Sequence, residues 1–135
     1  MYQVDLALLE ANRSHAPYSK SPAGVALVTS TGLKCHGPYI ENAAFNPAVS
    51  ALQSSLVHFV VKGEHASPYP TPRMGRHTHR MCFVTGGGDW GDITHVVLVQ
   101  IEGCSIGHEW STQMLMQKIA KKAEFHTVKC KRTSH

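Results

Sequence analysis

The residues best suited to chemistry lie close together in one segment of the chain. His77 and His79 are two positions apart, and Cys82 follows three positions later. Imidazole nitrogen and thiolate sulfur are preferred zinc ligands, and this spacing lets all three reach one metal from an extended loop. The metal alone would leave such a site without a proton shuttle. The segment is therefore a candidate metal site with an incomplete catalytic set.

The same segment is rich in arginine. Arg73, Arg76 and Arg80 suit bidentate contacts to phosphate, and Tyr69 and Trp90 could stack on bases. One interpretation is contact with RNA or with an acidic protein surface. The other is a solvated loop without a partner.

These residues belong to a long irregular stretch, residues 64–93, which we call the insert. It contains three alternating prolines and a triple glycine, and its one apolar run, "MCFVT", predicts a short strand. A loop of this length in a small domain is usually functional or disordered. The insert is therefore expected to add to the fold rather than to build it.

The composition is that of an ordinary globular protein. The chain has 135 residues, of which 42% are hydrophobic and 16% charged, and this length predicts a single domain over residues 1–135. No apolar run approaches the roughly 20 residues that span a bilayer, and the first residues lack the basic start of a secretory signal. We therefore expect an intracellular protein, with cytoplasm and mitochondrion not distinguished. The four cysteines form no CxxC pair and are expected to be reduced thiols.

Charge points weakly to an anionic partner. The formal net charge is +4, ten histidines add to it on acidification, and the tail "KCKRTSH" is basic. Nucleic acid and acidic protein surfaces are the classes of partner that this balance favours.

The elements that must position any site follow from hydrophobic periodicity. Val4, Leu8 and Ala11 predict a first helix that stops before Pro17. Later elements are predicted as a hairpin of strands at 24–29 and 33–40, a second helix after Pro47 with Val49, Leu52, Leu56, Phe59 and Val60 on its buried face, a central strand at 94–101 covered on both faces, a third helix at 110–122 with Met114, Leu115 and Ile119 inward, and a last strand at 125–130. This order predicts an α/β sandwich with a mixed sheet.

Several stretches together resemble cytidine deaminases. They are "RSHAPYSKSPAGVALVTSTG", "CHGPYIENAAFNP" and "LQSSLVHFVVKG", which cover roughly residues 3–63. The closest likeness is to the second, non-catalytic domain of the long, two-domain enzymes of bacteria and plants. The resemblance implies a three-layer α/β/α sandwich for the whole chain, with no counterpart for the insert.

The resemblance also implies where zinc chemistry would lie. Such deaminases hold zinc with one His or Cys and two further Cys, and a nearby Glu moves protons to the leaving amine. The motifs H-x-E and P-C-x-x-C fall on Ser50, Leu52, His108 and Ser111. Serine replaces a ligand, and leucine carries no proton under any environment. Cys104 and His108 would still give only two ligands. We therefore predict that the zinc site is lost and that no cofactor is bound.

The nucleoside pocket is altered in the same comparison. The family's ribose motif falls on Gly37 to Asn42, where Glu41 and Asn42 are retained and Tyr39 replaces an asparagine. By resemblance, Ala44 and Phe45 could lie over the active site of a neighbouring subunit. An equally good interpretation is that Phe45 only packs the turn before the second helix.

Three functions remain open from the sequence. The first is a pseudoenzyme that serves as a structural or interaction subunit of a deaminase assembly or of a larger, ribonucleoprotein complex, with itself, a catalytic deaminase or that complex as the protein partner. The second is a nucleoside-binding module without turnover. The third is a zinc-dependent cytidine deaminase with an unrecognised ligand set, for example His77, His79 and Cys82.

Overall fold

A four-stranded mixed sheet lies between two helical layers. The computed structural model describes residues 2–44, 47–65 and 90–131, with the side chains of residues 63–65 outside the description. The strands are β1 (Ala23–Thr29), β2 (Lys34–Pro38), β3 (Ile93–Ile101) and β4 (Glu124–Cys130), in the order β2-β1-β3-β4. β1 is antiparallel to both β2 and β3, whereas β3 and β4 are parallel. The predicted mixed sheet is thereby confirmed.

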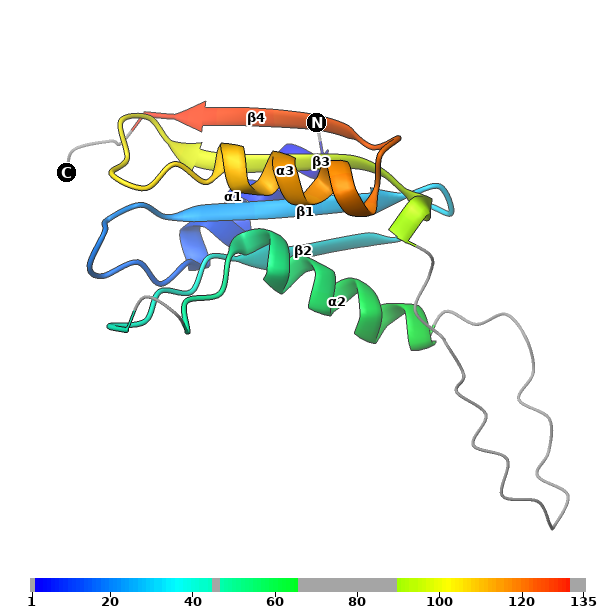
Figure 1. Ribbon diagram of the computed structural model, residues 1–135, viewed down its shortest axis with the longest axis horizontal. Helices are drawn as coiled ribbons and strands as arrows, with labels where there is room; N and C mark the ends of the chain where they lie inside the picture. Colours follow the sequence, from blue (N-terminus) through cyan, green and yellow to red (C-terminus); the bar gives the residue numbers. More distant parts are fainter. Residues whose placement is uncertain (1, 45–46, 66–89, 132–135) are drawn as a thin grey trace, which may run out of the picture.

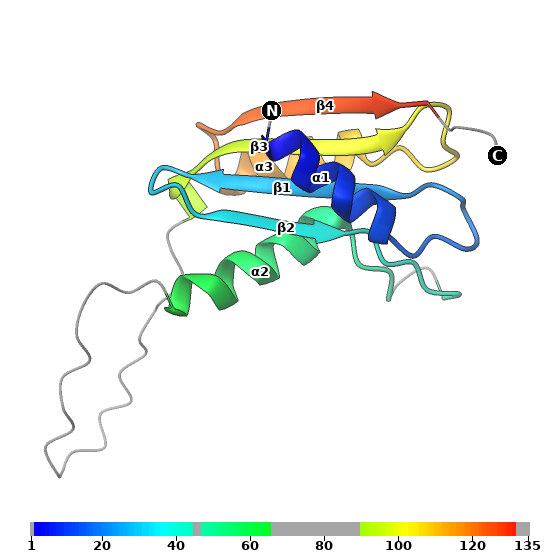
Figure 2. The same ribbon diagram turned by 180° about the vertical axis from the view of Figure 1, so that it is seen from behind.

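The helices divide between the two faces of the sheet. Helix α1 (Tyr2–Arg13) covers one face, and α2 (Ala51–His65) and α3 (Glu109–Ile119) cover the other (Figures 1 and 2). A short 3-10 turn, η1 (Trp90–Asp92), leads into β3. The predicted three-layer sandwich is present in the described residues.

Alternation along the strands fills both sides of the sheet. Val25, Leu27, Val96 and Leu98 pack under α2 and α3, while Ala26, Val97 and Val99 pack under α1. The nearly continuous apolar run of β3 is buried on both faces, as predicted.

Two glycines let helices approach the sheet closely. A Cβ at Gly24 would collide with the backbone of Ala7 and Ala11 in α1, and one at Gly37 would lie within 2.6 Å of the Ser54 carbonyl carbon in α2. Gly37 therefore fixes the distance between α2 and the sheet, and with it the position of the residues at the start of that helix.

Several details of the predicted helix faces are wrong. In α1, Leu8 is exposed, whereas Ala7 and Glu10 are buried. Glu10 is tolerated there because its Oε1 lies 2.9 Å from His36 Nδ1 of β2 and 3.3 Å from Arg13 Nη1. Apolar periodicity alone does not find such a paired carboxylate.

The buried faces of the second and third helices also differ from the predicted ones. Leu52 and Phe59 of α2 are buried as predicted, but Val60 is exposed. In α3, Met114 is exposed and the buried stripe is instead Thr112 and Met116, with Leu115 and Ile119 only partly covered. The strand predicted at 33–40 is shorter, and α3 ends at Ile119 rather than 122.

Candidate functional site

The starts of α2 and α3 meet at a small pocket of about 240 Å³. It is lined by Ser50, Leu52 and Gln53 from one helix start and by Ser111, Thr112 and Leu115 from the other. The structure therefore brings together three positions that the sequence singled out, namely Ser50, Leu52 and Ser111. His108, the fourth position, does not line this pocket.

Ser50 and Gln53 form a capping box at the start of α2. Gln53 N donates to Ser50 Oγ at 3.1 Å, and Ser50 N donates to Gln53 Oε1 at 3.0 Å. This reciprocal arrangement satisfies two backbone donors at the helix end. The S-x-x-Q pattern is legible in the sequence, and the sequence analysis above missed it.

Leu52 and Ser111 also have structural contacts. Leu52 is only 1% exposed and belongs to the main core cluster. Ser111 Oγ donates to His108 O at 3.2 Å, beside Thr112 Oγ1, which donates to the same carbonyl at 2.7 Å. Leu52 thus packs in the core, and the Ser111 hydroxyl bonds to the backbone at the start of α3.

His108 is a buried, hydrogen-bonded histidine. Its Nε2 lies 2.9 Å from Ser21 O and donates to it, and its backbone N donates to Gln100 Oε1 at 3.2 Å. Burial lowers the pKa of His108 below its ordinary value, although the Ser21 hydrogen bond and the Glu41 charge oppose this. The imidazole is therefore neutral near pH 7. Ser21 and Gln100 are partners that no sequence signal pointed to.

Tyr39 lies against His108. Its ring centroid is 4.6 Å from that of His108, and its side chain is 6% exposed. Burial raises the pKa of the Tyr39 hydroxyl, and the charge of Glu41 and a hydrogen bond to it raise it further. Tyr39 therefore fills this region as a neutral phenol.

Glu41 holds the loop that follows α1. Its carboxylate accepts from Tyr18 N at 2.8 Å and from Ser19 N at 3.1 and 3.2 Å. Burial raises the pKa of Glu41, but hydrogen bonds from Ser19, Tyr18 and Tyr39 outweigh it and leave the pKa below its usual range. The retained acid is thus committed to bonds within the chain.

The remaining predicted site residues fall into two groups. Asn42 and Ala44 are exposed, and Asn42 Oδ1 accepts from Ala44 N at 3.1 Å in a local turn. Outside the described residues are Phe45, Arg73, Arg76, His77, His79, Arg80 and Cys82. The candidate lid, metal and RNA contacts assigned to that second group stay predictions.

The pocket between the helix starts does not fit a zinc ion. Its lining offers hydroxyls, one amide and two leucines, whereas zinc in proteins takes thiolate, imidazole or carboxylate ligands. Within the ranges that the structure describes, no group of three or more His, Cys, Asp or Glu residues could hold a metal ion. Cys104 instead donates its thiol hydrogen to Ile106 O at 2.9 Å.

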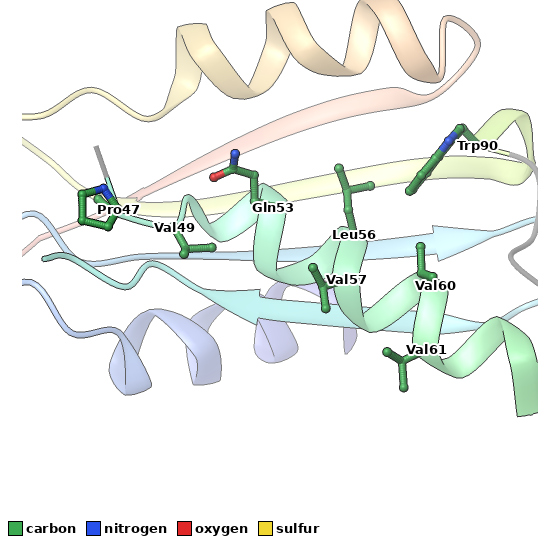
Figure 3. A pocket seen from close by; sticks show the side chains of 9 residues that line it. Pro47, Val49, Gln53, Leu56, Val57, Val60, Val61 and Trp90 are labelled. Atoms are coloured by element: carbon green, nitrogen blue, oxygen red, sulfur yellow. The ribbon is translucent and has the colours of Figure 1, made fainter. Parts of the chain in front are cut away.

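A second, larger concavity lies along α2. This groove, about 660 Å³, is lined by the following nine residues: Pro47, Ala48, Val49, Gln53, Leu56, Val57, Val60, Val61 and Trp90. Figure 3 shows Leu56 and Val60 on the side of α2 nearest Trp90, which comes from η1. None of the nine is charged. We call it the α2 groove.

The α2 groove is unusual for an exposed surface. Val57 is 63% exposed and Val61 53%, and α2 has no Lys, Arg, Asp or Glu before Lys62. Apolar patches that are depleted in charge mark interaction sites on soluble proteins. The sequence analysis missed this feature because it placed Val60 in the core.

Comparison with known proteins shows that this three-layer sandwich is a deaminase fold. Residues 2–68 match the family model described as the cytidine and deoxycytidylate deaminase zinc-binding region. Cytidine deaminase from Burkholderia pseudomallei superposes with a TM-score of 0.65 at 19% identity, over 98% of this chain and 85% of that one. The Mycobacterium leprae enzyme gives 0.56 at 21% identity, over 92% and 83%.

Two curated relatives show to which family of deaminases the chain belongs. The chain is 34% identical to cytidine deaminase 6 of Arabidopsis thaliana over 95% of its length, and 35% identical to cytidine deaminase 1 of the same plant over 92%. It belongs to the cytidine deaminase family. The chain spans about a third of the length of these curated relatives, 36% and 34%. No helix in the described residues is long and apolar enough to cross a membrane.

Proposed function

We propose that this chain is a non-catalytic cytidine deaminase-like domain that acts as a structural or interaction subunit, similar to the second domain of the long deaminases. The observation that carries the proposal is the set of roles at the pocket. Ser50 caps α2, Leu52 packs in the core, and Ser111 bonds to His108 O. A zinc-bound hydroxide needs ligands there, and proton transfer needs an ionisable group.

Binding of a nucleoside without turnover is less well supported. Glu41 would have to give up hydrogen bonds from Tyr18 and Ser19 to receive a sugar hydroxyl. Tyr39 and His108 pack against each other beside it. Replacing these contacts with a ligand would leave backbone donors of the loop without partners, which disfavours binding.

The α2 groove supports an interaction role. Its exposed valines and Trp90 form a contiguous uncharged surface, which a stable subunit of an assembly would cover. A further copy of this chain, a catalytic deaminase and a larger complex that contains RNA are the partners that we propose. In the last case the arginines of the insert would contact phosphate.

The decisive experiment measures zinc and turnover in the same sample. The chain is purified without chelator, zinc is counted per chain by mass spectrometry, and release of ammonia is followed with cytidine and deoxycytidine in added zinc. We expect zinc far below one per chain and no release above the protein-free rate. Stoichiometric zinc together with turnover would overturn the proposal.

A matched variant separates the remaining alternative. If zinc and turnover are both found, changing His77, His79 and Cys82 together to alanine tests whether the insert holds the metal. Loss of both signals would establish the third function, a working deaminase with ligands from the insert. The same measurement on Ser111→Ala serves as the control, because Ser111 supplies no zinc ligand chemistry.

A further inference from the structure

The two ends of the sandwich, between which the strands run, differ in charge. One end is formed by the β1–β2 hairpin, η1, the end of α2 and the turn from α3 to β4, which lie together at the right of Figure 1 and at the left of Figure 2. We call it the hairpin end. It is remote from the pocket between the helix starts, because α2 and α3 both run from that pocket towards the hairpin end.

Exposed lysines gather at the hairpin end. One begins β2, one lies in the last turn of α2, one lies in the last turn of α3, and two follow α3 in the turn before β4. These residues are Lys34, Lys62, Lys118, Lys121 and Lys122, and all of them are exposed. Neighbouring strands are about 4.8 Å apart, so the outer strands β2 and β4 are separated by roughly 15 Å. The lysines therefore form one basic surface across the end of the sheet.

None of these lysines forms an ion pair with a carboxylate in the part of the chain that the structure describes. Lys62 Nζ donates to Lys34 O at 3.1 Å, and Lys34 Nζ lies 4.1 Å from the centre of the Tyr2 ring. Their charges are thus not neutralised by acidic neighbours, and they remain available to an anionic partner.

Carboxylates at the hairpin end are fewer than the lysines among the described residues. Asp92 lies in η1, and Asp5 lies in the first turn of α1. Glu124 begins β4, and its Oε2 lies 3.6 Å from Nε2 of both His95 and His126. Protonation of these two histidines would add further positive charge to the same surface.

The opposite end of the sandwich has no such excess of lysine in the described ranges. Its lysines and carboxylates are equal in number, namely Lys20, Lys129 and Lys131 with Glu41, Glu102 and Glu109. Lys129 Nζ also lies 3.6 Å from Glu109 Oε2. The hairpin end is therefore the end that favours an anion.

Two exposed aromatic side chains accompany the lysines. Tyr2 is 59% exposed and Trp90 37%. Trp90 packs against Phe59 with 5.5 Å between the ring centroids, which holds the indole in place at the surface. Bases of a single strand stack on such rings, while lysines contact its phosphates. Aromatic rings among unpaired lysines favour single-stranded RNA over an acidic protein surface, which has no bases to stack.

We propose that the hairpin end binds single-stranded RNA, with Lys118, Lys121 and Lys122 on phosphates and Trp90 stacked on a base. This assignment rests on the proposed function in one respect, because it gives a surface to the RNA-containing complex among the proposed partners. RNA binding here needs no zinc, no α2 groove and no residue of the insert. Its failure would therefore leave the non-catalytic role intact, and zinc-dependent turnover would leave the RNA surface intact.

The first test is charge reversal, measured by fluorescence anisotropy of a labelled oligouridine over a series of salt concentrations. Lys121→Glu combined with Lys122→Glu should raise the dissociation constant about tenfold or more. The slope of the logarithm of affinity against the logarithm of salt concentration should become shallower by about 1.4, because each phosphate contact on a single strand contributes about 0.7. An unmodified chain that does not bind the oligouridine would overturn the proposal.

The matched control is Lys129→Glu combined with Lys131→Glu. It makes the same change of net charge at the opposite end, beyond the screening length of about 10 Å, so the dissociation constant should rise no more than about threefold. Circular dichroism checks that both double variants are folded. Equal losses in the two folded variants would show that only net charge matters and would overturn the proposal.

Tryptophan emission tests the stacking and needs no charge variant. The chain has two tryptophans, so Trp110→Phe leaves Trp90, and Trp90→Phe leaves Trp110 at the start of α3. Oligouridine should quench the emission of Trp90 and leave that of Trp110 unchanged. Binding without a change at Trp90 would refute the proposal. Polyglutamate that displaces the oligouridine at equal charge would also refute it and would assign the surface to an acidic protein.

Discussion

The pocket between the helix starts and the α2 groove both involve helix α2, but their side chains differ in burial and in hydrogen bonding. At the pocket, every position that the family resemblance assigned to chemistry contributes to a cap, to the core or to a backbone hydrogen bond. In the groove, large apolar side chains are left exposed. The comparison indicates that the polar positions at the start of α2 stabilise this fold, while the exposed apolar side chains that a partner could cover lie further along the helix.

The largest expected effect comes from truncating one apolar side chain of α2 on each side of this comparison. Leu52→Ala removes a fully buried side chain and should lower the free energy of unfolding by about 2–5 kcal/mol. Val57→Ala, five residues later on the same helix but 63% exposed, should change it by no more than about 0.5 kcal/mol. Urea denaturation of both variants measures the contrast. Equal losses would show that the two sides of α2 do not differ in packing.

A smaller effect is expected at the cap of the same helix. Ser50→Ala removes the acceptor of the Gln53 N–H and should cost about 1 kcal/mol of stability. Ser50→Asp keeps a good cap and should restore most of it. A Ser50→Ala variant that is as stable as the parent chain would contradict the capping role of Ser50 and leave this replacement of a zinc ligand without a structural explanation.

The difference between the two sides of α2 also explains what the sequence could and could not predict. The order of elements, the mixed sheet and the burial of Leu52 follow from apolar runs whose period is local. The exposed α2 groove does not, because Val60 has the same spacing as a core residue and only the position of α2 over β2 decides which valines are covered. Gly37, which sets that position, has no apolar signal at all.

The roles of the site residues divide in the same way. Replacement of a ligand by Ser50 and of an acid by Leu52 is visible in the sequence once the family motif is aligned. That Glu41 binds the amides of Tyr18 and Ser19 is not visible, because its partners are 22 and 23 residues away and are backbone groups of a loop. A retained acid therefore looks the same in the sequence whether it binds a sugar or a loop.

Acidification should weaken the structure around the pocket without involving the groove. The pKa of His108 is lowered in the folded chain. As the pH falls below the ordinary value near 6.5, the unfolded chain therefore binds a proton at His108 more readily than the folded chain does. The free energy of unfolding consequently decreases as the pH is lowered. The pKa of Glu41 is also lowered, so its contribution is lost at more acidic pH, below its ordinary value near 4.5. Both changes have the same sign.

Thermal unfolding from pH 8 to pH 4 measures this dependence. In His108→Gln the fall beginning near pH 6.5 should be shallower than in the parent chain, because the buried imidazole is gone. The fall at the lower pH should remain, since Glu41 keeps its loop contacts. A His108→Gln profile parallel to that of the parent would show that the other histidines account for the upper part of the dependence.

The smallest effect on stability, and the clearest on association, is expected in the groove. Val57→Asp combined with Val61→Asp places two charges on an exposed surface that has none, so the free energy of unfolding should change by about 0.5 kcal/mol or less. Any partner that covers the groove would have to bury both carboxylates, which is costly without countercharges. Native mass measured on chain recovered at its natural level should therefore fall in the double variant, whereas an alanine pair at the same positions should reduce it less. If the aspartate pair keeps the parent mass, the groove is not the assembly surface.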